Sequence, residues 1–401
     1  MTTTTRMIGL AVIAVCAGGL SAGEMKLANP KRVFPTTQPA YKSPTQHHAF
    51  AMRLSPGGKL LLYSRPAAGS EQADERSARY ELVLRELEGG KEAVLPIESV
   101  DLGWRTVALR FNFFDPAGNR LALPTIKVET RQIDGRMSST KSSVKWLIYD
   151  IAAGKVTSNG IDGPDGPAKF TADGQGLFTS GGRQMSTRII SLKDPNAEPK
   201  TLAAPGWLQS VCPSGDVAVF FVPPGRPAGP PQPGERMQRP PIRLVLWDLK
   251  ADKELALLPT HPSNSELDDR ETQWTADGRY LYYTDADVEQ AAADGRANPS
   301  FRRVTRVWDR QAGKPAGQIT DAVPVGPWTS SSLMVLAKQT GSDSGGFLVH
   351  DAASGREYTI GDDSKHLIHA YGGKVVYAQT PDGADGEVVF VADLVPSKPS
   401  E

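Results

Sequence analysis

A short pattern recurs along the chain and restricts its fold more than any other feature: an apolar residue, a turn of small polar residues ending in glycine, and an apolar run. The five clearest copies are LSPGGKLLLY at 54–63, FDPAGNRLAL at 114–123, FTADGQGLFT at 170–179, VCPSGDVAVF at 211–220 and WTADGRYLYY at 274–283. Two weaker copies, WTSSSLMVLA at 328–337 and AYGGKVVYA at 370–378, complete a series of seven. A period of roughly 40 to 60 residues is typical of the blades of a β-propeller.

A second element follows each turn, in which apolar residues lead to Asp and then to Gly-Lys, as in WLIYDIAAGK at 146–155 and TRVWDRQAGK at 305–314. Glycine permits the positive φ of a tight hairpin, and the Asp side chain can bond the backbone amides of its own turn. Each unit therefore predicts four antiparallel strands in sequence order. Since one such sheet cannot bury both of its faces, we expect an all-β, seven-bladed β-propeller of four-stranded antiparallel meanders.

The turns Ser55-Pro56-Gly57-Gly58-Lys59 and Thr275-Ala276-Asp277-Gly278-Arg279 resemble the Ser-Pro-Asp-Gly-Lys turn of WD40-like and TolB-type β-propellers of bacterial envelopes. The resemblance extends over nearly everything from residue 46 onward and implies the propeller fold. It implies little about function. The chain also departs from true WD40 repeats, because Trp-Asp pairs occur only at 247–248 and 308–309 and the Gly-His signature is absent.

Residues 1–23 have the pattern of a secretory signal peptide, with Arg6, an apolar run from Ile8 to Leu20 and small residues before the expected cleavage site. The run is too short to span a bilayer, and no other stretch could cross one. Cys16 raises lipidation as an alternative, although Val15 is larger than a lipobox requires. We therefore expect a periplasmic or secreted protein.

The last repeat supplies three clear strands, which would leave the ring with an open edge. Lys31 to Phe34 are capable of forming a strand, and we expect this segment to complete the last blade and close the ring. This assigns 24–45 to a Pro/Thr-rich leader, 46–395 to the propeller and 396–401 to a disordered tail. The alternative is that the whole leader is disordered.

Composition excludes some functional classes. The chain has 45 basic and 45 acidic residues, so nothing in its charge indicates nucleic-acid binding. Without the signal segment, Cys212 is the one remaining cysteine, and its place beside the repeated apolar position predicts a buried small side chain rather than a nucleophile. We expect no cofactor, and a monomer.

In a meander the loops alternate between two faces of the ring. We call the face of the short repeated turns the turn face, and the face of the connections between second and third strands the loop face. Long insertions are expected on the loop face at 65–79, 124–143, 223–242 and 284–303.

Binding residues are commonly carried by such loops. The candidates for binding another envelope protein or an acidic ligand are Arg226, Arg236 and Arg239 in the Pro-rich segment and Lys127, Arg131 and Arg136 in blade 2. The alternative is that these loops are solvated and have no partner.

Other candidates lie near the expected channel mouth. Trp104 and Arg105 stand at a blade entrance, where an aromatic ring could stack on a ligand or pack between blades. His48 and His366 are weak metal candidates at the start of the innermost strands of blades 1 and 7. Because His47 and His48 point to opposite faces of a regular strand, as do His366 and His369, each pair can give one ligand, and we assign no metal site.

Catalytic motifs are mostly missing. Ser342-Asp343-Ser344-Gly345-Gly346 lacks a surrounding His-Asp framework, and the chain has no Gly-x-Ser-x-Gly elbow, phosphate loop or Cys/His metal spacing. A non-catalytic binding or scaffold propeller is therefore favoured. The alternative is a propeller enzyme, such as a lyase or lactonase, with its site at the channel mouth.

Overall fold

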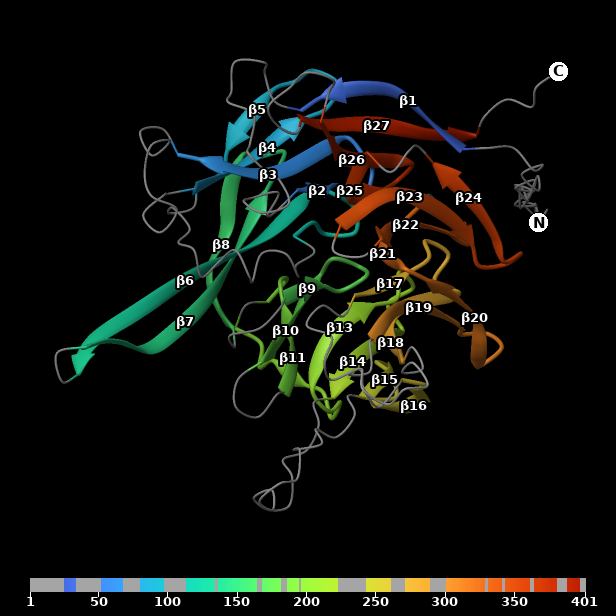
Figure 1. Cartoon of the computed structure of the whole chain (residues 1–401). Coiled ribbons are helices and arrows are strands. Elements are labelled where there is room, and N and C mark those ends of the chain that lie inside the picture. The colour runs from blue at the N-terminus through green and yellow to red at the C-terminus, as the bar shows by residue number, and fades with distance from the viewer. Residues whose placement is uncertain are drawn as a thin grey trace, which may run out of the picture.

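The computed structural model describes residues 25–33, 52–67, 80–96, 113–133, 136–163, 168–181, 186–194, 196–222, 243–260, 271–288, 301–328, 331–340, 343–360, 364–380 and 388–396. Within these ranges the chain forms seven antiparallel sheets arranged as a ring of blades (Figure 1). The expected all-β, seven-bladed propeller is confirmed. The expected signal segment and the tail after Pro396 lie outside the described residues.

Each blade is a meander whose strands pair in sequence order. Blade 1 contains β2 (Arg53–Leu54), β3 (Leu60–Pro66), β4 (Tyr80–Glu86) and β5 (Glu92–Val94). Blade 2 contains β6 (Arg120–Ile133), β7 (Arg136–Asp150) and β8 (Lys155–Gly163), and its innermost position is a single bridge from Phe114 to Leu121. Blade 3 contains β9 (Ala168–Phe170), β10 (Gly176–Gly181), β11 (Ser186–Ser191) and β12 (Lys200–Thr201).

The remaining blades follow the same order. Blade 4 contains β13 (Trp207–Val211), β14 (Val217–Val222), β15 (Arg243–Asp248) and β16 (Lys253–Leu258). Blade 5 contains β17 (Thr272–Trp274), β18 (Tyr280–Val288), β19 (Phe301–Asp309) and β20 (Lys314–Thr320). Blade 6 contains β21 (Ala322–Pro327), β22 (Leu333–Thr340), β23 (Asp343–Asp351) and β24 (Arg356–Ile360). Blade 7 contains β25 (Lys365–Tyr371), β26 (Lys374–Gln379), β27 (Val388–Pro396) and β1 (Met25–Arg32).

The N-terminal strand β1 closes the ring by pairing antiparallel with β27, and the two strands run side by side in Figure 1. The closing strand differs from the expected one in extent: it covers Met25–Arg32, and Val33 adds a backbone hydrogen bond to Val389 of 2.9 Å, whereas Phe34 lies outside the described residues. The closing segment starts earlier than the expected Lys31 because its buried side chains lie at its two ends, at Met25 and Val33. The Pro/Thr-rich composition of residues 24–45 gave no sign of these buried contacts.

The repeated turns have the conformations that the sequence predicts. The glycine of the first turn has a positive φ in blades 1 to 5, for example 63° at Gly58 and 69° at Gly278. The aspartate after the third strand accepts hydrogen bonds from its own turn, as Asp309 does from the amides of Gln311 and Ala312 at 2.8 and 3.0 Å. These residues therefore serve the fold.

The hydrophobic core lies mainly in the seams between blades. One cluster joins blades 4 and 5 through Val219, Leu246, Trp274 and Leu281, and another joins blade 7 to blade 1. Cys212 is 1% exposed and packs in the first of these clusters, which confirms that it is a buried small side chain. Packing of each sheet against its neighbours buries both of its faces.

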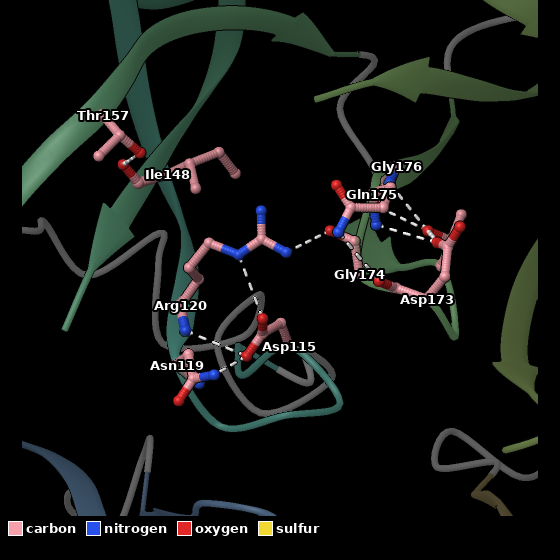
Figure 2. Close-up of polar contacts among 10 residues, drawn as sticks. Asp115, Asn119, Arg120, Ile148, Thr157, Asp173, Gly174, Gln175 and Gly176 are labelled. Atoms are coloured by element: carbon pink, nitrogen blue, oxygen red, sulfur yellow. Dashed lines mark hydrogen bonds and ion pairs between the residues drawn. The ribbon is translucent and has the colours of Figure 1, made fainter. Parts of the chain in front are cut away.

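Polar contacts reinforce a seam on the turn face (Figure 2). Asp115 accepts backbone hydrogen bonds from Asn119 at 2.7 Å and Arg120 at 3.0 Å, and its second oxygen accepts the Arg120 Nε–H at 3.1 Å. The Arg120 guanidinium also donates to the carbonyl of Gly174 in blade 3. The charged residues of these turns hold blade 2 against blade 3 and are not free to meet a ligand.

The expectation of a polar loop over 124–143 is wrong, because most of this insertion is strand. β6 and β7 form a long ribbon that projects from the ring (Figure 1), and its register continues to the pair Ile133 and Arg136. The alternation from Ile126 to Ile133, followed by Asp134-Gly135, is a hairpin signal that explains the ribbon. The insertion over 284–303 is likewise partly strand, since β18 reaches Val288 and β19 begins at Phe301.

Candidate functional site

The basic residues proposed from sequence for the loop face lie in two connections between second and third strands. Lys127 and Arg131 belong to β6, opposite Ser143 and Ser138 on β7, and Arg136 is the first residue of β7. Arg226, Arg236 and Arg239 lie outside the described residues, in the segment between β14 and β15. Because the topology is a meander, both connections belong to the same face of the ring.

The ribbon has a third strand along only part of its length. β8 pairs with β7 between Val144 and Asp150, so the part of the ribbon beyond Val144 is two-stranded in the described residues. Two-stranded ribbons are marginally stable by themselves in water. Among the described residues, the projecting part therefore has no third strand to stabilise it.

Of the four candidates expected near the channel mouth, one lies in the part of the chain that the structure describes. Trp104, Arg105 and His48 lie outside the described residues, and their roles stay predictions. His366 is a half-buried residue of β25. Among the described residues, no group of three His, Cys, Asp or Glu side chains is arranged to hold a metal ion.

The expectation that His366 and His369 point to opposite faces is wrong. A bulge lies between Leu367 and His369, so His366 pairs with Ala378 and His369 with Val376, two residues apart on β26. Both histidines therefore belong to the same side of the sheet, the side that packs on blade 1. An inserted residue reverses the alternation of a strand, and the sequence carries no clear sign of it.

A group of charged side chains that sequence reasoning missed lies at the axis of the ring. Arg53 of β2, Lys169 of β9 and His369 of β25 come from blades 1, 3 and 7, and Glu271 precedes β17 of blade 5. Arg53 interacts electrostatically with each of the other three. Blades 1, 3 and 5 are not neighbours in the ring, so Arg53 can approach Lys169 and Glu271 only across the axis. We call these three residues and His369 the axial group.

Local sequence explains how these side chains reach the axis. Arg53 stands between Met52 and Leu54, and Lys169 between Ala168 and Phe170, and all four of these neighbours are buried. Because side chains alternate along a strand, the charged residue points away from the side that its neighbours bury. The signal in the sequence is a charged residue directly before the repeated apolar position, at Arg53 and Lys169.

The axial group is predominantly cationic. Burial, and then the charge of Arg53, lower the pKa of Lys169 to about 8. Burial lowers the pKa of Arg53, and Glu271 partly opposes this effect. Burial and Arg53 hold the pKa of His369 well below its usual value, so this imidazole is neutral at pH 7.

The neutral His369 has a defined tautomer. Its Nδ1 accepts a hydrogen bond from the backbone N–H of Leu54 at 3.3 Å. The proton of the neutral ring is therefore on Nε2, which is left as a donor. The axial group thus combines a guanidinium, an ammonium and an imidazole N–H with one carboxylate.

Comparisons with known proteins establish the fold and leave the function open. No family model and no curated protein matches the chain. The chain is similar to the β-propeller domain of Cps50 (Swd1) from Myceliophteria thermophila, with 11% identity, a TM-score of 0.51 and coverage of 90% of this chain and 99% of that one. It is also similar to an oligogalacturonate lyase in complex with manganese, with 12% identity, a TM-score of 0.50 and coverage of 93% and 98%.

A third similar structure is the β-propeller domain of the trilobed protease from Pyrococcus furiosus, with 11% identity, a TM-score of 0.51 and coverage of 86% of this chain and 97% of that one. That propeller has an open velcro topology, whereas here β1 pairs with β27. The resemblance to WD40-like and TolB-type propellers thus holds for the fold. The described residues contain no helix of the length and hydropathy needed to span a membrane.

Proposed function

We propose that this protein is an exported, non-catalytic propeller that binds an acidic partner protein of the cell envelope through its loop face. The observation that carries the proposal is the β6–β7 ribbon, which projects from a ring whose other described connections follow the blades closely (Figure 1). The ribbon adds length that the propeller does not need. Its residues 124–143 contain four basic side chains and two acidic ones.

The distribution of roles between the two faces supports the proposal. Charged residues on the turn face, such as Asp115 and Arg120, form hydrogen bonds within their own turn and with the neighbouring blade. The loop face carries the ribbon and the Pro-rich segment, which adds Arg226, Arg236 and Arg239. Basic side chains in this arrangement would speed association with an acidic surface and weaken with salt. The expected export signal at 1–23 gives the proposed location.

The experiment compares three variants of the mature protein in quantitative capture from envelope extract. One replaces Arg226, Arg236 and Arg239 by Ser, and the second replaces Lys127, Arg131 and Arg136 by Ser. The matched control replaces Lys91, Lys155 and Lys314 by Ser. These three exposed lysines lie at turns between third and fourth strands, and therefore on the turn face. All three variants lose the same charge.

We expect the two loop-face variants to lose capture of the specific partner at low salt, while the control keeps it. High salt should weaken wild-type capture, because surface attraction is screened within about 8–10 Å at physiological ionic strength. Thermal melting should be nearly unchanged in all three, since exposed charges contribute about 0–1 kcal/mol to stability. Capture that survives both loop-face substitutions and high salt would place the partner site elsewhere.

A further inference from the structure

The ribbon formed by β6 and β7 has an edge that no described strand covers (Figure 1). β6 is an edge strand of its sheet, and on the side away from β7 the described residues pair with it only at its start, around the bridge at Leu121. The Ala122 N–H donates to the Phe113 carbonyl at 2.8 Å and therefore points to this side. Because N–H directions alternate along a strand, every second residue beyond Ala122 also faces the open edge. The residues whose N–H groups lie on this edge of the ribbon are Ile126, Val128, Thr130 and Gln132.

The open edge of β6 has few of the features that keep other strands away. Exposed edges are commonly protected by bulges, prolines or charged residues. The bulge of this ribbon belongs to β7, where Thr140 is the extra residue, and the pairing of β6 stays regular to Ile133. Pro124, which has no N–H to donate, stands at the start of the open edge and not within it. Over residues 125–133, charged residues are therefore what selects the strand that can pair there.

The charges on β6 form a pattern that is complementary to itself. Lys127, Glu129 and Arg131 occupy alternate positions, so they belong to one face of the ribbon. Antiparallel pairing of two copies of β6, centred on Val128, places Lys127 of each copy opposite Glu129 of the other. Opposite charges directly across a ladder are stabilising and like charges are destabilising. A register centred on Glu129 would set this residue against itself and Lys127 against Arg131, so repulsion opposes that register.

The register centred on Val128 also suits the backbone. Val128 pairs with itself across the two-fold axis, and Ile126 pairs with Thr130, so all of these residues turn N–H and C=O groups toward the other copy and can exchange hydrogen bonds. Lys127 and Glu129 then form the non-hydrogen-bonded pairs, in which facing side chains are closest. Because the contact is isologous, it closes at two copies.

Two further features of β6 bear on the choice of register. Glu129 lies opposite Lys141 on its own β7, and a carboxylate has acceptor sites for cations on both sides. A register centred on Thr130 would also join opposite charges, Glu129 to Arg131. It shortens the overlap of the two strands from 123–133 to 127–133, however, so fewer backbone groups pair.

We propose that two copies of this protein associate through the open edges of β6, antiparallel and centred on Val128, so that their ribbons form one continuous sheet. The pairing gives each projecting ribbon a third strand, and two-stranded ribbons are marginally stable by themselves. The dimer takes the place of the monomer expected from the sequence. It does not depend on an acidic partner, and it goes beyond the proposed function.

The first test measures the dimer dissociation constant of the mature protein by sedimentation velocity. The wild type should show a monomer–dimer equilibrium. Lys127→Glu and Glu129→Lys should each raise the dissociation constant about tenfold or more, because two opposite-charge pairs become two like-charge pairs. Lys155→Glu and Glu88→Lys are the matched controls. They make the same charge changes at exposed turn-face positions and should leave the constant unchanged.

Recombining the two charge changes separates pairing from a structural effect on the ribbon. The double variant K127E/E129K again sets Glu against Lys, so it should dimerise nearly as well as the wild type. A mixture of the two single variants should form a heterodimer, since both of its charge pairs are then attractive. Damage to the fold of either variant would not be repaired by mixing two separately folded proteins.

A disulfide test measures the register directly. Val128→Cys sets two thiols opposite each other with about 5.5 Å between their Cα atoms, a separation that a disulfide can span. Oxidised glutathione should therefore link V128C into a covalent dimer. Thr130→Cys is the matched control, because its two copies lie about 13 Å apart along the strands and should stay unlinked. Cys212 is 1% exposed and does not compete for the oxidant.

Any of four results would refute the proposal: a wild type that stays monomeric at all concentrations, equal dissociation constants in wild type, K127E and E129K, a mixture of these variants that stays monomeric, or linking of T130C in preference to V128C. The loop-face proposal is tested separately. Replacement of Arg226, Arg236 and Arg239 by Ser should reduce partner capture and keep the dimer, so either proposal can fail while the other stands.

Discussion

At the scale of single residues, a buried tyrosine–histidine pair joins blade 5 to blade 6. Tyr282 Oη and His350 Nδ1 lie 2.7 Å apart, and both side chains are buried. Burial lowers the pKa of His350 below its usual 6.5, and Asp351 opposes this shift only in part. The imidazole is therefore neutral in the folded protein at pH 7, whereas the unfolded chain binds a proton near pH 6.5.

This difference predicts a loss of stability on mild acidification. The free energy of unfolding keeps its full value above pH 6.5 and falls as the pH drops below it, by at most about 1.4 kcal/mol per pH unit for this group. Asp309 and Asp351 add nothing in this range, because hydrogen bonds with their neighbours lower their pKa values below 3.8. Urea denaturation at pH 7.5 and 5.5 measures the effect.

His350→Asn provides the comparison, since the amide oxygen can accept the Tyr282 hydroxyl without titrating. The variant should lose less stability than wild type between pH 7.5 and 5.5, with the remainder due to His369, whose pKa is also depressed. An equal loss in both proteins would mean that His350 does not contribute. Tyr282→Phe, which keeps the histidine, should retain the dependence on pH.

At the scale of elements, blade packing depends on positions where two backbones meet. Gly326 of β21 is such a position: a Cβ there would lie 1.8 Å from the carbonyl oxygen of Ala370 in blade 7. Gly317 of β20 provides a matched control, because a Cβ there meets nothing within 4 Å and its φ is not positive. Both glycines are strand residues.

Gly326→Ala should destabilise the protein by about 3 kcal/mol or more, because neither backbone can move without opening the seam between blades 6 and 7. Gly317→Ala should be neutral or slightly stabilising, since alanine restricts the unfolded chain. Chemical denaturation of the two variants measures the difference. Equal effects would show that the seam is adaptable at this point.

At the scale of the whole molecule, the two ends of the described chain meet. Met25 pairs with Pro396, so a two-residue Asn-Gly turn can join them as a hairpin. New ends can then be made between residues 264 and 265, in the segment that joins β16 to β17. The permuted chain keeps all seven blades and loses only the covalent link between blades 4 and 5.

The permuted protein should fold and melt within about 5 °C of wild type, because the seam between blades 4 and 5 is held by buried side chains such as Leu246 and Trp274. Deletion of residues 24–34 is the comparison and should lower the melting temperature by several degrees, since it removes the outer strand of blade 7 and costs on the order of a few kcal/mol. A permuted chain that melts as low as the deleted one would show that closure depends on chain connection rather than on packing.

The local pattern of the sequence determined the blades. The turns around Gly58 and Gly278, the aspartate cap at Asp309 and the burial of Cys212 depend on residues close together in the chain, so they could be predicted from it. The ribbon carried a readable signal as well, in its alternation and its Asp134-Gly135 turn. Each of these features is set by short-range backbone preferences and by the period of apolar residues.

Only the tertiary structure brought together the axial group. Arg53, Lys169, Glu271 and His369 are each about 100 or more positions apart, and the closed ring places the last three within electrostatic reach of Arg53. The bulge before His369 likewise reverses the side of the sheet that the sequence assigns to that residue. Such features depend on how seven similar sheets fit around one axis, and packing at that scale leaves no local pattern in the chain.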